Sequence, residues 1–215
     1  MLKLKFCNKA VAYFMLIMAL LVLGCNGSGS DIAAVNVPNS RASLYDSRDG
    51  QTYKIVTIGS QTWMAENLNY EMAKSSCFKN DPSMCEKYGR LYFWAAAMEA
   101  CPQGWHLPSL EEWKILMDAV GGENVAGSVL KAKTGWRNNG NGSDLYGFSV
   151  LPAGYGCEKF EGEGVDAYFW SSYNSSCGNE FGACYGSMDF DDDKDEAWLF
   201  RYDEDCGFSV RCLKN

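Results

Sequence analysis

The chain has 215 residues, of which 47% are hydrophobic, 14% aromatic and 21% charged, and this composition excludes a disordered tail, a coiled coil and a collagen-like fibre. Its ten cysteines are more than an ordinary cytosolic enzyme of this size carries. The single histidine, His106, excludes metal sites built from several histidines.

Residues 1–24 have the pattern of an export signal. Lysines at positions 3, 5 and 9 precede an apolar run over residues 10–23. At 14 residues the run is shorter than the roughly 20 apolar residues that a membrane span needs, and it fits the core of a signal peptide. We therefore expect residues 1–24 to be a signal peptide that is removed on export.

A cysteine follows the apolar run. The sequence Leu-Val-Leu-Gly-Cys at residues 21–25 resembles the bacterial lipobox, in which the cysteine is acylated before the signal is cleaved. We predict a lipoprotein in which Cys25 carries the lipid, with palmitate among its acyl groups, and anchors the chain to a membrane of the bacterial cell envelope. Asn26 follows the cysteine in place of Asp, which favours the outer membrane and the cell surface. An ordinary signal peptide with an incidental cysteine is the alternative.

The mature chain divides into a tether and a domain. Residues 25–44 comprise the lipidated cysteine and a stretch rich in Gly, Ser, Asn and Ala, and are expected to be flexible. Residues 45–215 are long enough for one domain with a sizeable core.

The negative charge is local. The mature chain has 16 basic and 27 acidic residues, and residues 158–205 alone carry 14 acidic against 3 basic ones. Nucleic acid is excluded as a partner because phosphate binding needs a basic surface. Cations or a basic surface suit this region, and a solvated acidic face that only aids solubility is the alternative.

Eight cysteines remain after the signal is removed and Cys25 is acylated. An even number in an exported chain indicates disulfides. Two pairs would close short, turn-rich loops, and two would close long loops, one of them tying the middle of the domain to its end. Of the 105 pairings that eight cysteines allow, loop geometry favours Cys77 with Cys85 and Cys177 with Cys184. The other four cysteines would close longer loops, and pairing Cys101 with Cys212 would leave Cys157 with Cys206. Zinc is the weaker alternative, since the chain has no Cys-x-x-Cys spacing.

The first predicted elements are a β-hairpin over residues 50–64, with Gly59-Ser60 as its turn, a strand over 89–94 and a short helix over 95–100.

The clearest helix begins at Ser109. Ser109 and Glu112 have the spacing of a capping box, and Gly121-Gly122 ends the helix. A second helical stretch is expected over residues 125–133.

From residue 145 onward the pattern is β. The predicted strands cover residues 145–151, 167–172, 197–202 and 208–212. In the third of them Trp198, Phe200 and Tyr202 alternate with Leu199 and Arg201, which predicts a half-buried strand. Helices early and strands late indicate the α+β class.

The segment Cys-Pro-Gln-Gly-Trp-His-Leu-Pro-Ser-Leu-Glu-Glu-Trp at residues 101–113 resembles the signature of the Fibrobacter succinogenes major paralogous domain family. Further segments match the pattern of this family in the same order along the chain; they are residues 49–50, 58–68, 88–92, 147–154, 169–172 and 209–212. The resemblance covers residue 45 to the end and implies a secreted protein or lipoprotein.

A more distant similarity is to C-type-lectin-like and formylglycine-generating-enzyme-like domains. It implies a single disulfide-stapled domain with a looped antiparallel sheet and one or two short helices, and it agrees with a Cys101–Cys212 bond. The lectin triplets that bind calcium and sugar, Glu-Pro-Asn, Gln-Pro-Asp and Trp-Asn-Asp, are absent. Cys206 and Cys212 are similar to a copper-binding cysteine pair of the sulfatase-modifying enzymes, although their spacing is one residue longer.

Two sets of residues are candidate binding sites. Alternating acids in an extended chain point the same way and suit calcium, the one candidate cofactor; these are Asp189, Asp191, Asp193 and Asp195. Tyrosines in Gly- or Ser-rich loops could contact a ligand; these are Tyr155, Tyr173 and Tyr185. A solvated acidic loop and ordinary packing are the respective alternatives.

No catalytic constellation is recognised. His106 is expected to be structural, and Glu111 and Glu112 have a sufficient role in capping a helix. We therefore expect a non-catalytic binding or adhesion module, for polysaccharide or a surface protein, with contacts from residues 173–196 and their aromatic neighbours. The alternatives are a copper-dependent oxidase-like enzyme and a purely structural envelope protein.

Overall fold

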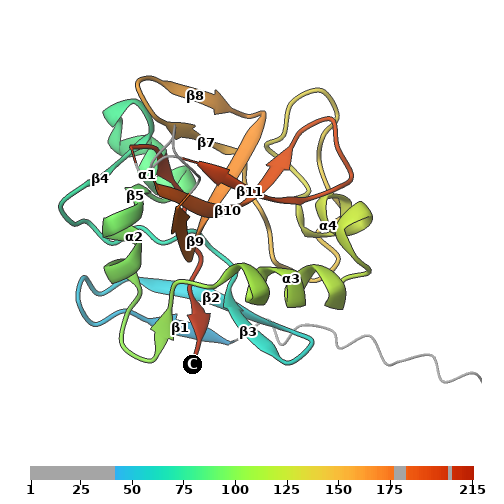
Figure 1. Cartoon of the computed structure of the whole chain (residues 1–215), viewed down its shortest axis with the longest axis horizontal. Helices are drawn as coiled ribbons and strands as arrows, with labels where there is room; N and C mark the ends of the chain where they lie inside the picture. The colour runs from blue at the N-terminus through green and yellow to red at the C-terminus, as the bar shows by residue number, and fades with distance from the viewer. Residues whose placement is uncertain (1–41, 177–182, 203–204) are drawn as a thin grey trace, which may run out of the picture. The chain divides into compact units, whose positions relative to one another are not determined.

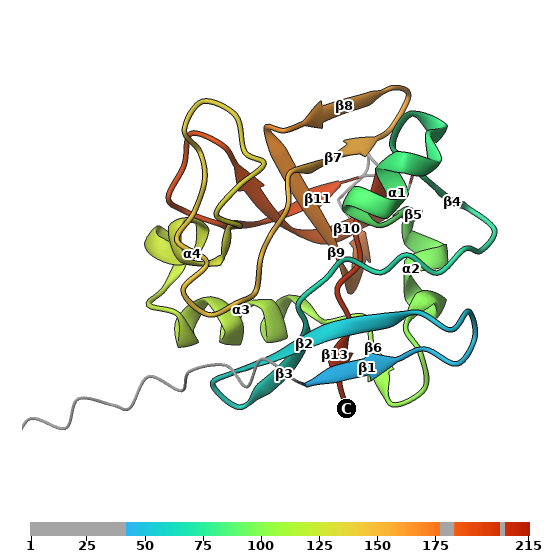
Figure 2. The same ribbon diagram turned by 180° about the vertical axis from the view of Figure 1, so that it is seen from behind.

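The computed structural model describes residues 42–176, 183–202 and 205–215, without the side chains of 175, 176 and 183–185 (Figures 1 and 2). The expected signal peptide, Cys25 and most of the expected tether lie outside these residues. Within the described ranges, no helix has the length and apolar character needed to cross a membrane.

The first sheet has five strands in the order β1-β2-β3-β13-β6. Their bounds are β1 Ser43–Tyr45, β2 Thr52–Ile58, β3 Gln61–Met64, β13 Leu213–Lys214 and β6 Trp105–His106. The predicted hairpin is confirmed as β2 and β3, and Gly59 has the positive φ of 58° that its turn requires. Leu213 pairs with both Trp63 and His106, so the last strand joins the hairpin to β6.

The second sheet runs β11-β10-β9-β7-β12-β5-β4, with β8 paired to β7. Its strands are β4 Ser75–Ser76, β5 Leu91–Phe93, β7 Ala153–Gly156, β8 Phe160–Glu163, β9 Asp166–Ser176, β10 Ala183–Asp191, β11 Trp198–Tyr202 and β12 Gly207–Phe208. All pairings are antiparallel except that of β7 with β9.

The described residues form four α-helices, more than the one or two expected. They are α1 Pro82–Tyr88, α2 Trp94–Ala100, α3 Leu110–Ala119 and α4 Glu123–Leu130, and a single 3₁₀ turn, η1, covers Phe78–Asn80. The capping box of Ser109 and Glu112 is confirmed. Helix α1 was not predicted, although Asp81 caps it and Pro82 occupies its first turn, where proline is favoured. The α+β class is confirmed.

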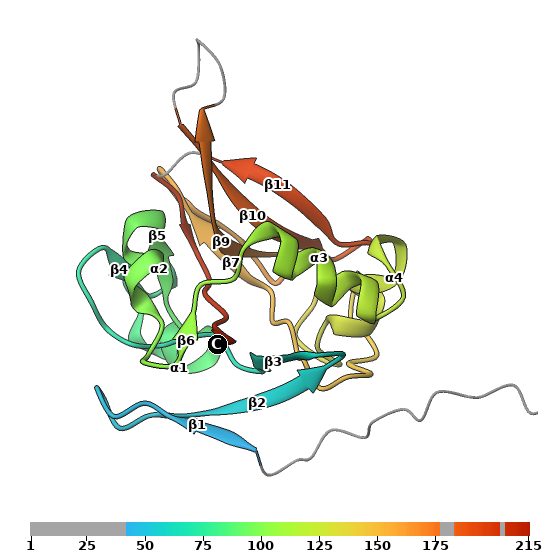
Figure 3. The same ribbon diagram turned by 60° about the horizontal axis from the view of Figure 1, so that its bottom comes forward.

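The core lies on both faces of β9. Adjacent residues of a strand point to opposite faces, so Phe169 packs with Trp63 and Trp113 while Trp170 packs with Phe208 in a second cluster. Figure 3 shows α3 between the β2–β3 hairpin and strands β9 to β11.

Two strand predictions are wrong in part. Residues 145–151 form a loop with one isolated bridge at Val150, because Gly147 and Ser149 adopt positive φ values of 71° and 56° that break an extended strand. Residues 208–212 lie between β12 and β13 and are mostly outside both. In β11, Phe200 is 57% exposed, since β11 is an edge strand with no neighbour to cover it.

Three disulfides are described: Cys77–Cys85, Cys101–Cys212 and Cys157–Cys206. Each is one of the expected pairs. The fourth expected pair, Cys177 with Cys184, lies outside the described residues.

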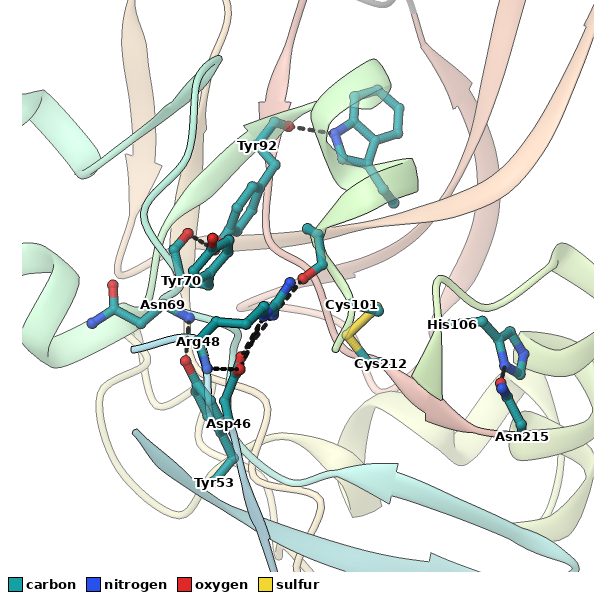
Figure 4. The surroundings of a disulfide bond; sticks show 12 residues. Asp46, Arg48, Tyr53, Asn69, Tyr70, Tyr92, Cys101, His106, Cys212 and Asn215 are labelled. Atoms are coloured by element: carbon teal, nitrogen blue, oxygen red, sulfur yellow. Dashed lines mark hydrogen bonds and ion pairs between the residues drawn. A yellow bond between two sulfur atoms is a disulfide. The ribbon is translucent and has the colours of Figure 1, made fainter. Parts of the chain in front are cut away.

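Arg48 ties the start of the domain to the Cys101–Cys212 disulfide region (Figure 4). Its Nη2 atom lies 2.6 Å from Asp46 Oδ2 and donates a 2.8 Å hydrogen bond to the carbonyl of Ala100, the last residue of α2. This carbonyl is one of the helix-end acceptors that lack a helical partner. The Arg48 guanidinium also holds the pKa of Asp46 below its ordinary value.

Candidate functional site

Four aromatic side chains form a continuous row across the second sheet, which we call the aromatic strip: Tyr155, Tyr168, Tyr202 and Phe200. Ring centroids are 5.1 Å apart from Tyr155 to Tyr168, 5.5 Å from Tyr168 to Tyr202 and 5.4 Å from Tyr202 to Phe200. The three tyrosines are half-buried. Phe208 lies beneath them, with its centroid 5.1 Å from those of both Tyr168 and Tyr202.

The rings of the strip share one face of the sheet because successive residues of a strand point to opposite faces. Tyr168 and Trp170 point to one face of β9, and Ala167 and Phe169 point to the core beside α3. On β11, Phe200 and Tyr202 lie on one face of the strand and Arg201 lies on the opposite face. The strip therefore contains residues that are far apart in sequence but share one face.

A chain of hydroxyls leads from the strip to a buried carboxyl group. The side chain of Tyr202 interacts with those of Tyr168 and Asp189, and Ser187 Oγ donates a 2.7 Å hydrogen bond to Asp189 Oδ1. Asp189 is directly opposite Tyr168 in the β9–β10 register. Burial raises the pKa of Asp189 to about 7, against the lowering effect of the Ser187 and Tyr202 donors.

Further carboxyl groups flank the strip. Asp166 and Asp191 face each other across β9 and β10. Burial, with the neighbouring charges of Asp191 and Asp192, raises the pKa of Asp166 to about 6. At the other end, Tyr155 donates a 3.1 Å hydrogen bond to Glu161 Oε2. Successive tyrosine rings are nearly perpendicular, at 82° from Tyr155 to Tyr168 and 85° from Tyr168 to Tyr202, so the strip offers ring edges and faces bordered by hydroxyl and carboxyl groups.

The structure does not bring the four carboxylates of the calcium hypothesis together. Strand β10 ends at Asp191 and the chain then turns, so Asp193 and Asp195 are exposed while Asp189 is buried. Across the part of the chain that is described, no three His, Cys, Asp or Glu side chains are grouped to hold a metal ion.

An internal lysine organises the acidic loop instead. Lys131, at the end of α4, is buried, and its Nζ donates to the main-chain carbonyls of Asp191 at 2.9 Å, Asp192 at 3.4 Å and Lys194 at 2.7 Å. Burial lowers the pKa of Lys131, although the neighbouring aspartates oppose this effect. The ammonium group thereby binds the carbonyl oxygens that a bound cation would otherwise contact.

Of the three predicted contact tyrosines, the structure places only Tyr155 in the strip. Tyr173 contacts Arg201, with its hydroxyl 3.4 Å from Nη2 and its ring 5.3 Å from the guanidinium carbon. The side chain of Tyr185 lies outside the described residues. Tyr168, Tyr202 and Phe200 were missed because their shared face depends on strand pairing, although their alternation within each strand was visible.

His106 has both ring nitrogens in structural contacts. Nε2 lies 3.0 Å from Glu112 Oε1, and Nδ1 lies 2.7 Å from Asn215 Oδ1 (Figure 4). Ser109 bonds to Glu112 and to no histidine nitrogen, so this group lacks the nucleophile–base contact of a hydrolase.

Both cysteines of the copper hypothesis take part in disulfides. Cys206 is bonded to Cys157 and Cys212 to Cys101, so the two residues do not form a free thiol pair. Thiolate is the form of cysteine that binds a metal.

A buried arginine joins three segments of the fold. Arg211 has no exposed surface, and burial lowers its pKa to about 9. Its Nε donates to Asn67 Oδ1 and its Nη2 to Ser149 O, both at 2.8 Å, while Nη1 donates to Phe148 O. Its guanidinium carbon lies 4.7 Å from the centroid of the Phe148 ring.

Comparison with known proteins identifies the family. The family model of the Fibrobacter succinogenes major domain matches residues 56–214. No curated protein and no solved structure matches the chain. Three segments that carry the resemblance, residues 58–68, 147–154 and 209–212, meet at Arg211, so this part of the pattern specifies the fold.

Proposed function

We propose that this chain, which belongs to the Fibrobacter succinogenes major domain family, is a non-catalytic binding module that is tethered by a lipid on Cys25 to the outer membrane of a bacterial envelope. Its ligand is a polysaccharide, and the aromatic strip is the surface that binds it. The tether and the location rest on the sequence of residues 1–26.

The continuity of the strip is the observation that carries the proposal. Successive centroids 5.1–5.5 Å apart give a row of rings with a polar atom at most of its members. Sugar rings have apolar faces and hydroxyl edges, so they pack on aromatic rings while their hydroxyls bond to polar groups alongside. Glu161 and the tyrosine hydroxyls provide such partners beside the strip.

A polymer fits this surface better than a small ligand. The strip spans β7, β9 and β11, so a chain of repeating units can contact Phe200 and the half-buried tyrosines together. Contact with several units raises affinity without a deep pocket.

Retention on insoluble cellulose and xylan tests the proposal. Phe200→Ala removes the most exposed ring and is expected to reduce retention at least fivefold, while Tyr45→Ala removes a ring of similar exposure, 64%, from β1 outside the strip and should leave it unchanged. If the wild-type chain is retained on neither polymer nor on any polysaccharide of a glycan array, the proposal is wrong. Capture of a basic protein from the cell surface, with no polysaccharide bound, would also contradict it.

A further inference from the structure

We infer that the polysaccharide of the proposed function, on which this inference rests, is an amino-sugar polymer, and that its ammonium groups lie against the tyrosines of the aromatic strip. The strip combines two features that suit a cation. Its tyrosine rings are nearly perpendicular to one another, and carboxyl groups lie beside them. A neutral polysaccharide would use the rings alone, whereas an amino-sugar polymer would contact both.

The rings of the three tyrosines form corners. The planes of Tyr155 and Tyr168 meet at 82°, and those of Tyr168 and Tyr202 meet at 85°. Such rings share no flat surface on which several sugar rings could pack, but a compact ammonium group in a corner contacts the face of a ring. The face of an aromatic ring attracts a cation. Phe200, which is exposed, remains available to pack on the apolar face of a sugar.

Glu161 strengthens this attraction at one end of the strip. It lies opposite Tyr155 in the register of β7 and β8, and its Oε2 atom accepts a 3.1 Å hydrogen bond from the Tyr155 hydroxyl. A phenol that donates to a carboxylate has a more electron-rich ring, so the face of the ring attracts a cation more strongly. Because Glu161 is exposed, one ammonium group can contact the carboxylate and the ring together.

The carboxyl groups along the strip differ from their neighbour Glu163. Among the described residues, no lysine or arginine forms an ion pair with Glu161, Asp166 or Asp191. Glu163, two residues beyond Glu161 in β8, has its Oε2 atom 2.9 Å from Arg137 Nη2. The carboxyl groups of the strip are therefore open to a cation that a ligand supplies.

Two of these carboxyl groups are close enough to repel each other. Asp166 faces Asp191 across β9 and β10, and it precedes Tyr168 by two residues on the same face of β9, which is about 7 Å along the strand. Burial and the charges of Asp191 and Asp192 raise the pKa of Asp166 to about 6. An ammonium group beside Asp166 and Asp191 would relieve this repulsion.

The charge of the surrounding region disfavours acidic polysaccharides. Residues 158–205, which supply every ring of the strip except Tyr155, carry 14 acidic against 3 basic residues. A polymer with uronate or sulfate groups is repelled by this field, and a polymer with ammonium groups is attracted over about 10 Å at 0.1 M salt. The local contacts and the wider field thus favour the same class of ligand.

Three hexasaccharides with the same β-1,4-linked backbone test the inference: those of glucose, N-acetylglucosamine and glucosamine. They differ only at carbon 2, which carries a hydroxyl, an acetamide or an amine. In calorimetric titration of the full-length chain at pH 6.5, the glucosamine hexamer is expected to bind about tenfold more tightly than the other two. If another hexamer binds as tightly, the inference is wrong while the proposed function holds. If none of the three binds, the inference is also wrong, and retention on polymers and the glycan array decide the proposed function.

Four variants separate recognition by the strip from attraction to the net charge. Glu161→Gln and Asp166→Asn each remove a charge beside the rings and should reduce the preference for the glucosamine hexamer about threefold to fivefold. Asp195→Asn removes the same charge from an exposed position outside the strip and should leave the preference unchanged. Phe200→Ala should weaken all three hexamers by a similar factor, because its ring packs on the sugar and not on the amine. An equal loss of preference in Asp195→Asn and the two strip variants would overturn the inference.

Discussion

Lys131 Nζ donates a 2.9 Å hydrogen bond to the main-chain carbonyl of Asp191, so an acidic loop is organised by a cation from its own chain. Ser128 supports the same loop, since its N–H donates to Asp195 O at 2.9 Å. A glycine is required at position 140, because a Cβ there would collide with the carbonyl of Asp192.

Replacing Lys131 should therefore loosen the loop. Lys131→Met leaves three carbonyls without their donor, and we expect it to lower the free energy of unfolding by about 3 kcal/mol, as measured by urea titration. Lys133→Met, at an exposed position two residues on, should change it by less than about 0.5 kcal/mol. Calcium should not raise the unfolding temperature of the wild type, and a clear rise would contradict this account of the loop.

The buried carboxyl group of Asp189 makes stability depend on pH. Its pKa is about 7 in the folded chain and near 3.8 in the unfolded chain, so the folded state holds more protons between these values. The free energy of unfolding should therefore fall as pH rises from about 4 to 8, with a contribution from Asp189 of up to about 4 kcal/mol.

Asp189→Asn should reduce this dependence, because the amide is neutral at every pH of the range and still accepts from Ser187. Urea midpoints measured between pH 4.5 and 8 check this. Asp193→Asn, at an exposed position of the same acidic region, is the control. An unchanged slope in Asp189→Asn would show that the carboxyl group is already ionised when the chain is folded.

The long disulfide should contribute more to stability than the short one. Cys101 and Cys212 are 111 residues apart and Cys77 and Cys85 are 8 apart. In the loop-entropy account, replacing both cysteines by alanine should cost about 4–5 kcal/mol for the long pair and about 2–3 kcal/mol for the short pair. Urea unfolding of the two double variants measures the difference, and equal losses would contradict the loop-length argument.

Acylation at Cys25 predicts where the protein is found. In cells labelled with a palmitate analogue, the wild-type chain should carry label and sediment with outer membranes, and Cys25→Ala should do neither. Cys7→Ala, within the expected signal peptide, should be labelled as the wild type is. An unlabelled, uncleaved wild-type chain would refute the predicted tether.

Elements with local signals could be predicted from the sequence. The β2–β3 hairpin follows from β-branched residues around Gly59-Ser60, and the start of α3 follows from Ser109 and Glu112, which are three residues apart; each signal lies within one short segment. Residues 145–151 were misassigned because their apolar composition is that of a strand, whereas Gly147 and Ser149 adopt positive φ values that composition does not reveal.

The candidate site depends on long-range contacts. Tyr155, Tyr168 and Tyr202 become neighbours only through the order of β7, β9, β10 and β11, which no short segment encodes. The contacts of Lys131 could not be predicted either, since its acceptors are about 60 residues away in the chain and a lysine at a helix end is ordinarily solvated.

The position of β13 has a consequence for synthesis. The strand that connects the N-terminal hairpin to β6 is formed by residues 213 and 214, so the first sheet cannot close while those residues are still inside the ribosome. Before then the hairpin has only β1 as a neighbour within its sheet. The first sheet is therefore completed only after translation has passed residue 214.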